Sequence, residues 1–331
     1  LDRPMTADDL ALEAAAALAG IGDMPALQSA LRRLRNRFQL RIVWRHLACR
    51  AALEETTTNL SVLADTLIHA VLERVYDWAA LREGEPAPWE GQRQRMVVLA
   101  LGKLGARELN LSSDVDLVFA YPEAGSTARG RTHQQFFVRC GQLLIQALDT
   151  VTADGFVFRV DMRLRPYGDS GPLAMSFHAM EDYFLTQGRD WERYAFIKAR
   201  ACAGDIKAGE GFLARLTPFV WRRHLDFAAI EDAHNMRIRI RDHKGLAGAI
   251  AVPGHDLKLG QGGIRDIEFF AQTRQLICGG RDADLRAEDA ADQQAAHQRA
   301  HIEHGRTERG EGEAAAGVED AHDLRGERDK Q

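Results

Sequence analysis

Residues 102–121, GKLGARELNLSSDVDLVFAY, combine a glycine turn, a pair of aspartates and an apolar run. Asp114 and Asp116 are separated by one residue at the beginning of a β-prone segment. Because alternate side chains of a strand share a face, the two carboxylates project side by side while Val115 and Leu117 point into the core. Such a pair resists double ionisation unless a cation lies between the carboxylates, and Mg²⁺ prefers hard oxygen ligands of this kind. An isolated pair is more often a solvated strand end, so the prediction of a metal site needs support from the rest of the chain.

The composition is that of an ordinary soluble protein. The 331 residues are enough for about two domains, and the net charge of −5 gives no reason to expect nucleic-acid binding. The four cysteines form no Cys-x-x-Cys pair, which favours a reducing environment over a zinc site or a disulfide framework. No apolar run is long enough to span a membrane, and no signal segment is present. We expect a cytoplasmic protein and, because Leu1 stands in place of an initiator Met, a fragment of a longer chain.

The first 81 residues have the apolar periodicity of helices. Gly20 and Gly22 interrupt the first helix, and a third helix is expected over 60–78 after a loop at 56–59. The second helix has arginines on every side, at positions 32, 33, 35, 37, 41 and 45. This spread favours a solvated or interdomain surface over a phosphate or RNA patch.

A Gly- and Pro-containing linker at 83–88 precedes a region with the pattern of a sheet. A buried strand is expected over 96–101, the aspartate pair begins a second strand, and an amphipathic helix covers 132–148. A third strand is expected over 156–165, where Pro166 stops it.

The third strand places one acid among basic residues. Alternation puts Asp161 on one face with Arg159, Arg163 and Arg165. A structural ladder of salt bridges explains this pattern as well as a functional site does. In the functional interpretation, Asp161 completes a carboxylate trio with the aspartate pair, and the arginines bind phosphate oxygens.

Three acids on adjacent strands, with a glycine turn and basic residues around them, indicate metal-assisted phosphoryl or nucleotidyl transfer. The expected catalytic residues and metal ligands are Asp114, Asp116 and Asp161, with Mg²⁺ or Mn²⁺ as the ion. The expected nucleotide- and phosphate-binding residues are Gly102, Lys103, Ser112, Ser113, Arg163 and Arg165. The glycine turn lacks P-loop spacing, but its backbone N–H groups can still approach a phosphate.

From Phe177 onward the pattern is mainly helical, with helices expected over 179–203, 206–223 and 227–243. Two charge pairs within 189–193 are expected to be ion pairs on a helix surface. A Gly-rich turn opens another helix within 258–270, where Asp266 and Glu268 are candidates for supporting the site without contacting substrate.

Residues 282–331 have no aromatic residue and few apolar residues larger than Ala. Such a segment cannot build a core. We expect this tail to be disordered, or to be an out-of-frame translation that replaced a continuing helical domain.

Four segments in this order resemble the glutamine synthetase adenylyltransferase family: GKLGARELNLSSDVDLVF, VDMRLRPYGDSGPL, EDYFLTQGRDWERYAFIKAR and KLGQGGIRDIEFF. The similarity extends from the first helices to Gly280. It implies an α+β architecture, namely a nucleotidyltransferase (polymerase β-like) fold with a small mixed β-sheet, flanked by N-terminal helices and a C-terminal helical bundle. The expected parts are an N-terminal helical region at 1–85, the catalytic core at 92–176, a helical bundle at 177–281 and the tail at 282–331.

The resemblance is to the amino-terminal half of this bifunctional family, which implies deadenylylation in the regulation of nitrogen assimilation. In that reaction phosphate releases ADP from the adenylyl-tyrosine of glutamine synthetase. The implied partners are glutamine synthetase, a PII-type signal protein, ATP or ADP, phosphate, and glutamine as an effector, without nucleic acid or membrane. The resemblance also implies that Asp114, Asp116 and Asp161 hold the metals.

Two alternatives stay open. The same site could add AMP from ATP to glutamine synthetase, since the metals serve both directions. The region could also be a catalytically silent regulatory module that binds a PII protein or glutamine synthetase, although the intact acid trio argues against this.

Overall fold

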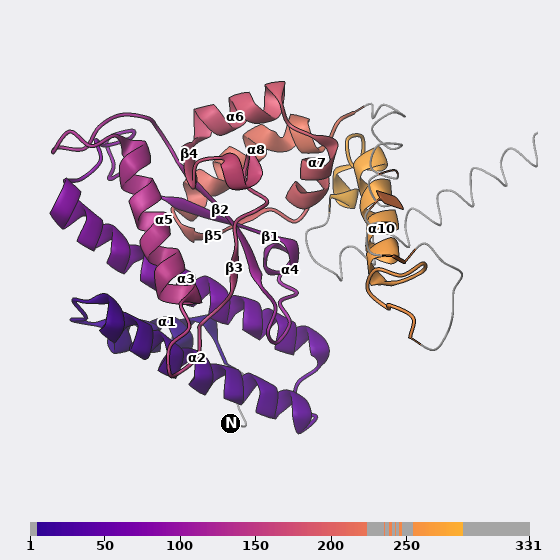
Figure 1. Ribbon diagram of the computed structural model, residues 1–331, viewed down its shortest axis with the longest axis horizontal. Coiled ribbons are helices and arrows are strands. Elements are labelled where there is room, and N and C mark those ends of the chain that lie inside the picture. The colour runs from indigo at the N-terminus through magenta and orange to yellow at the C-terminus, as the bar shows by residue number, and fades with distance from the viewer. Residues whose placement is uncertain are drawn as a thin grey trace, which may run out of the picture.

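The protein has an α+β architecture built around a small mixed sheet (Figure 1). The computed structural model describes residues 5–223 and 254–286, together with positions 235, 238, 239, 242, 245 and 246. The helix expected over 227–243 and the tail beyond 286 lie, apart from those positions, outside the described residues. No helix of the described ranges combines the length and the apolar character needed to cross a membrane.

Three helices open the chain: α1 (Ala7–Leu18), α2 (Met24–Leu47) and α3 (Leu53–Glu83). The side chains of Thr6 and Asp23 accept hydrogen bonds from the first turns of α1 and α2, which fixes where these helices start. The expectation of a loop at 56–59 is wrong, because α3 already begins at Leu53. The hydroxyl of Thr56 donates to the carbonyl oxygen of Ala52 at 2.9 Å, so the threonine satisfies its polar group within the helix.

The sheet contains β1 (Val97–Leu101), β2 (Val115–Tyr121), β3 (Val160–Asp161), β4 (Ala174–Ser176) and β5 (Arg200–Gly204). β1 lies between β2 and β5 and is antiparallel to both. The other edge of β2 pairs in parallel with two strands, β3 at its beginning and β4 at its end. The sheet is therefore mixed, as expected.

Two secondary-structure predictions in and around this sheet are wrong. The third strand spans Val160–Asp161 rather than 156–165, since the chain turns directly after Asp161 and β4 occupies the rest of the β2 edge. The helix expected over 179–203 is divided into α6 (Phe177–Thr186) and α7 (Asp190–Phe196), and its last residues form β5. Ala201 and Ala203 fit a helix by propensity, but the free edge of β1 recruits them as a strand.

The sheet has a different set of helices on each face (Figure 1). Val98 and Ala100 of β1 belong to a core with α1, α2, α3 and α5 (His133–Asp149). Val97 and Leu99 belong to a second core with α6, α7 and α8 (Ile206–Val220). Alternation along β1 thus joins both cores through one strand.

Four more elements belong to the described residues. They are α4 (Gly102–Gly105), the 3₁₀ turn at Gly168–Ser170, α10 (Ile264–Cys278) and the 3₁₀ turn at Ala283–Leu285. α10 follows the Gly-rich turn as expected, and Figure 1 shows it beside the body of the molecule, next to α7.

The arginine-rich helix α2 has a structural role. Arg32 is completely buried and donates to the carbonyl oxygens of Gly155 at 2.7 Å and Ala147 at 3.2 Å, and also to that of Thr150. The last two oxygens belong to the end of α5, which has no basic residue of its own in its last turn. Arg32 therefore caps α5 from another element and matches its negative end.

Candidate active site

The register of two parallel strands brings the acids together. β2 and β3 pair Val115 with Val160 and Asp116 with Asp161. The N–H of Val115 donates to the carbonyl oxygen of Arg159 at 2.9 Å, which fixes this register. Asp114 immediately precedes β2, Asp116 is its second residue and Asp161 is the last residue of β3, so the three acids occupy neighbouring backbone positions. Val115 and Leu117 are fully buried on the opposite face, as the alternation predicts.

Two of the three acids have arginine partners. Arg163 donates to Asp161 through its backbone N–H at 2.9 Å and through its guanidinium Nε at 3.0 Å. Arg159 forms an ion pair with Asp114 and also donates to the backbone carbonyl of Ser112. The hydrogen bonds from the Arg163 side chain lower the pKa of the Asp161 carboxyl. Partial burial of the carboxyl opposes this shift.

The environment of Asp116 disfavours its ionised form, in contrast to that of Asp161. Burial, followed by the negative charges of Asp161 and Asp114, raises the pKa of its carboxyl to about 6. The positive charges of Arg265 and Arg163 oppose this shift. A carboxylate that burial and two like charges disfavour is one that a bound cation would stabilise.

The glycine turn is in contact with Asp116. Gly102 has a φ of +55°, and a Cβ at this position would overlap the Asp116 carboxylate. Glycine therefore suits both the positive φ and the close approach, and a larger residue here would displace the Asp116 carboxylate. Lys103, the next residue, is exposed in the short helix α4.

The remaining expected phosphate-binding residues fall into two groups. Ser112 has a φ of +66° and Ser113 follows it, in the turn that leads into the acid pair. Arg165 does not share a strand face with Asp161, because the strand has ended. Its side chain is 11% exposed and donates to the carbonyl oxygens of Met162 at 2.7 Å and Gly171 at 3.4 Å, so it holds the following turn.

The donor set is of the chemical type that a hard divalent cation binds, since three carboxylates lie at neighbouring positions of β2 and β3 and one of them is destabilised as an anion. In the present side-chain arrangement, no group of three or more His, Cys, Asp or Glu residues within the described ranges is positioned to hold an ion. Arg159 and Arg163 supply the positive charge at Asp114 and Asp161 instead. Metal binding would therefore require these carboxylates to turn from their arginines toward Asp116.

The sequence analysis missed a buried lysine beside this site. Lys198 is 5% exposed, and its Nζ lies 3.3 Å from Glu108 Oε2 and 3.1 Å from Glu268 Oε1. Its only signal was a basic residue in a segment expected to be helical. Asp266, in contrast, accepts from the N–H of Gly262 at 2.9 Å and thus holds the turn before α10.

The prediction of surface ion pairs at 189–193 is wrong for one member of each pair, because Glu192 and Arg193 are buried while Arg189 is exposed and Asp190 is partly exposed. Glu192 is fully buried and accepts from Tyr183 Oη at 2.8 Å and from the N–H of Arg189 at 2.7 Å. Arg193 is 2% exposed, pairs with Asp190 at 3.3 Å and lies over the ring of Phe219. These contacts fix α7, on which α10 packs.

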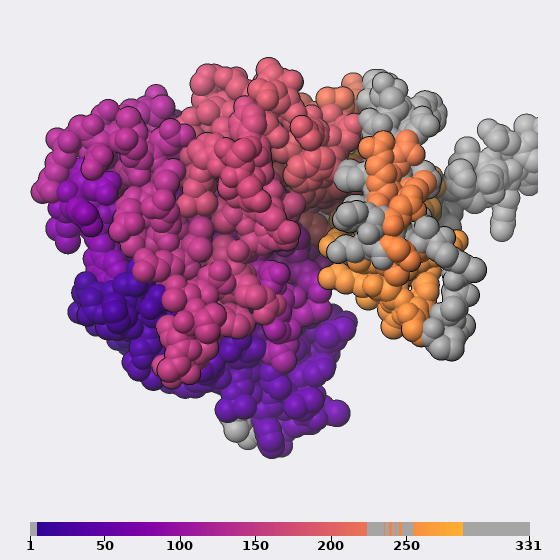
Figure 2. Space-filling view, viewed as in Figure 1, coloured from indigo at the N-terminus to yellow at the C-terminus, as the bar shows by residue number. Residues whose placement is uncertain are grey.

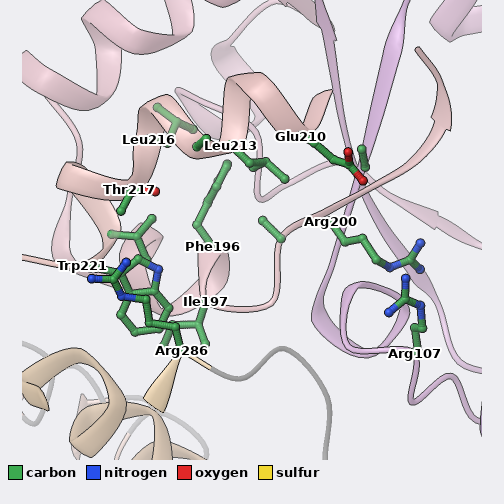
Figure 3. Close-up of a pocket in the computed structure, with 14 residues that line it drawn as sticks. Arg107, Phe196, Ile197, Arg200, Glu210, Leu213, Leu216, Thr217, Trp221 and Arg286 are labelled. Atoms are coloured by element: carbon green, nitrogen blue, oxygen red, sulfur yellow. The ribbon is translucent and has the colours of Figure 1, made fainter. Parts of the chain in front are cut away.

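A cavity of about 350 Å³ lies apart from the acids, between α8 and the segment that leads into β5. Figure 3 shows Arg107 and Arg200 at one end, Trp221 and Arg286 at the other, and Phe196 and Leu213 between them. Arg200 is also engaged by Asp65, with Nη1 2.8 Å from Oδ2. None of the expected catalytic residues lines this cavity.

Comparisons with known proteins agree with one another. Residues 1–215 match the family model of glutamate-ammonia ligase adenylyltransferase, and residues 234–311 match that of GlnD PII-uridylyltransferase. The second match passes Gly280, where the resemblance was expected to stop.

Three similar proteins share the name bifunctional glutamine synthetase adenylyltransferase/adenylyl-removing enzyme. That of Pseudomonas aeruginosa is 52% identical over 86% of this chain and 29% of its own length. Those of Hahella chejuensis and Pseudomonas putida are 53% and 54% identical, each over 77% of this chain and 26% of its own length. The chain thus spans less than a third of the length of these relatives.

Proposed function

Because the chain belongs to the glutamate-ammonia ligase adenylyltransferase family, we propose that it carries the adenylyl-removing activity, phosphorolysis of adenylyl-tyrosine in glutamine synthetase. The sheet with the acids on β2 and β3 would be the core of a nucleotidyltransferase fold. The observation that carries the proposal is the pairing of Asp116 opposite Asp161 with Asp114 beside them. This is a donor set for an ion that binds phosphate oxygens.

Asp114, Asp116 and Asp161 would hold Mg²⁺ or Mn²⁺. When bound, the ion neutralises phosphate charge and orients the phosphate oxygens. The raised pKa of Asp116 supports this assignment, because its carboxylate lacks the arginine partner that its two neighbours have. The relief of repulsion among the three acids would favour ion binding.

The proposed step needs no strong general base. An oxygen of hydrogenphosphate attacks the adenylyl phosphorus, the bond from phosphorus to the tyrosine oxygen breaks, and the hydrogenphosphate proton ends on that oxygen. The products are ADP and the free tyrosine of glutamine synthetase. The protein's contribution is positioning and charge neutralisation.

Arg163 is the proposed phosphate-binding residue among the two expected arginines. Its side chain is 74% exposed, whereas that of Arg165 is held in the turn. When Asp161 turns to an ion, the guanidinium of Arg163 is released for the incoming phosphate, which it can bind bidentately. Lys103, the N–H groups of the Gly102 turn and Ser112-Ser113 would complete the nucleotide-binding surface.

Control by a PII-type protein is part of the same proposal. It is supported by the match of residues 234–311 to the PII-uridylyltransferase model. Glutamine as an effector is proposed on the family resemblance alone.

The test is an assay of the full chain with Mg²⁺ or Mn²⁺ in two arms. Adenylylated glutamine synthetase plus phosphate should release ADP, whereas unmodified glutamine synthetase plus ATP should gain no AMP. Asp114→Asn should abolish ADP release without changing the circular dichroism spectrum. AMP incorporation without ADP release would reverse the proposed direction, and inactivity in both arms would favour a silent regulatory module.

A further inference from the structure

The short helix α4 connects β1 to the surroundings of the acids. It begins directly after Leu101, the last residue of β1, which pairs with Asp116 of β2. Gly102, the first residue of α4, lies against the Asp116 carboxylate. On the other side of β1, Ala100 pairs with Arg200 of β5. The position of α4 therefore determines how closely the glycine turn approaches Asp116.

Arg200 holds the other end of α4. Its Nε donates to the carbonyl oxygen of Gly105 at 3.2 Å, and its Nη2 donates to that of Leu104 at 2.9 Å. A cation at the carbonyl groups that end a helix satisfies their hydrogen bonding and matches their partial negative charge. Gly105 also lies so close to the backbone carbonyl of Lys198 that no Cβ fits there. β5 and the residues before it thus fix the C-terminal end of α4.

Asp65 of α3 in turn holds the guanidinium of Arg200. Nη1 lies 2.8 Å from Oδ2 and Nη2 lies 3.1 Å from Oδ1, which is a bidentate arrangement. The side chains of Arg200 and Asp65 are only 10% and 23% exposed. Figure 2 shows the N-terminal helices, in indigo and purple, as one continuous body with the magenta residues that follow them. Asp65 and Arg200 therefore link α3, through α4, to the Asp116 carboxylate.

We infer that Arg200 is a positioning residue of the proposed active site: it holds α4 so that the Gly102 turn keeps the Asp116 carboxylate in place. The inference rests on the proposed function of the acids. The role suits arginine, because its planar guanidinium bonds two carbonyl oxygens and a carboxylate at once, a geometry that a lysine ammonium does not reproduce. If α4 shifts, Asp116 loses the surface it lies against, and the acid trio binds an ion less tightly.

Hydrogen exchange on the full chain tests whether Arg200 holds α4. The amides of residues 106–108 report on this helix, since they donate to the carbonyl oxygens of residues 102–104. In Arg200→Lys their exchange rates should rise about tenfold or more, because the end of α4 loses its forked donor. Exchange in α5 should stay at the parental rate. Asp65→Asn should affect the same amides by a smaller factor, because asparagine keeps one acceptor but loses the charge.

Arg45→Lys is the matched control. Arg45 is a similarly buried arginine, with its side chain 6% exposed, and its Nε lies 2.9 Å from Glu55 Oε1. Its Nη2 also donates to the carbonyl oxygen of Arg50 at 3.0 Å. The control thus loses a comparable ion pair and a backbone hydrogen bond within the N-terminal helices. It should leave the exchange of residues 106–108 at the parental rate.

The ADP-release assay tests whether the position of α4 matters to the acids. Arg200→Lys should raise the Mg²⁺ concentration for half-maximal ADP release about tenfold or more and should lower kcat, because a displaced Asp116 binds the ion less tightly. Arg45→Lys should keep both parental values. Mn²⁺ binding, followed by electron paramagnetic resonance, should weaken by the same factor in Arg200→Lys, and this measurement needs no turnover.

Parental exchange at residues 106–108 in Arg200→Lys would show that Arg200 does not hold α4. Faster exchange with a parental Mg²⁺ requirement, kcat and Mn²⁺ affinity would overturn the positioning role, because the contacts would then serve the fold alone. If the parent chain bound Mn²⁺ but released no ADP, the proposed function would fail, while exchange and Mn²⁺ binding would still decide the role of Arg200. A parent that bound no Mn²⁺ would overturn both.

Discussion

Asp116 differs from its two acidic neighbours in a way that links stability to function. Asp114 and Asp161 are each neutralised by an arginine, while Asp116 is left in a buried and negative environment. Its ionisation therefore opposes folding until a cation arrives. Such a cost is typical of sites whose charges are arranged for a ligand and not for the free protein.

Replacing Asp116 by Asn should stabilise the metal-free protein at high pH. Because the pKa of Asp116 is raised from 3.8 to about 6 on folding, the folded state holds this proton more tightly than the unfolded state. Wild-type stability consequently falls as the pH rises between these two values. At pH 8, in chelator, Asp116→Asn should be more stable by about 2 kcal/mol in urea unfolding, and the difference should shrink as the pH falls through 6.

Asp169→Asn is the control, since the Asp169 side chain is 81% exposed, and it should change stability by less than about 0.5 kcal/mol. Added Mg²⁺ should stabilise the parent but not Asp116→Asn. A parent that equals or exceeds Asp116→Asn in stability at pH 8 in chelator would contradict the assigned environment.

Gly102→Ala should damage the site more than the fold. Both Gly102 and Gly91 have a positive φ, of +55° and +76°, so alanine costs about 1 kcal/mol of stability at either position. Only at Gly102 does the new Cβ meet the Asp116 carboxylate, whereas nothing lies within 4 Å at Gly91. ADP release should fall roughly a hundredfold in Gly102→Ala, through displacement of Asp116.

Gly91→Ala should keep the parental rate of ADP release. Equal rates in the two alanine variants would show that the contact between the glycine turn and Asp116 has no part in the reaction.

At the residue scale, local sequence rules predicted the aspartate pair but not the partners of Lys198. Spacing was enough to place Asp114 and Asp116 together, because alternation in a strand is a local property. The sequence analysis proposed Asp161 as the third acid of the trio, and the register of β2 and β3, which no local rule gives, sets it opposite Asp116. The partners of Lys198 could not be predicted, since Glu108 and Glu268 are 90 and 70 residues away along the chain.

At the scale of elements, the pairing of strands within the sheet decided the secondary structure where local propensity favoured another outcome. The alternation over 156–165 is compatible with a long strand, yet β4 takes the part of the β2 edge that such a strand would need. Residues 200–204 are compatible with a helix, yet they complete the sheet at β1. The amphipathic helix α5 was predicted well, because its apolar stripe and the capping box of Thr132 and Gln135 are local signals.

Arg32→Met tests whether one element caps another. The substitution keeps the aliphatic stem but leaves the carbonyl oxygens at the end of α5 without their buried donor. The free energy of unfolding should fall by roughly 3–4 kcal/mol, because charged hydrogen bonds are lost and buried acceptors stay unpaired. Arg33→Met, the exposed neighbour, should change it by less than about 0.5 kcal/mol. Similar midpoints for both variants in urea unfolding would contradict the capping role.

At the scale of the whole molecule, β1 and β2 connect the N-terminal helices to the helices that follow the sheet. A linker at 83–88 suggests that the N-terminal helices are a separate part, but Leu67 and Val71 of α3 share a core with β1 and β2. The opposite face of the same two strands supports α6, α7 and α8. If either layer of helices, α1–α3 with α5 or α6–α8, separated from the sheet, one apolar face of β1 would be exposed to water.

This arrangement predicts one cooperative unfolding transition for residues on both sides of the sheet. Trp78 packs against the core that contains α1, α2, α3 and α5, and Trp221 packs against the core that contains α6, α7 and α8. Variants that retain only one of these tryptophans, with the others replaced by Phe, should have urea midpoints that coincide when each is also followed by circular dichroism. A Trp221 signal that changes well before the Trp78 signal would mean that the second core opens by itself. Asp116, which lies on a strand common to both cores, would then lose its support from one side before the protein unfolds.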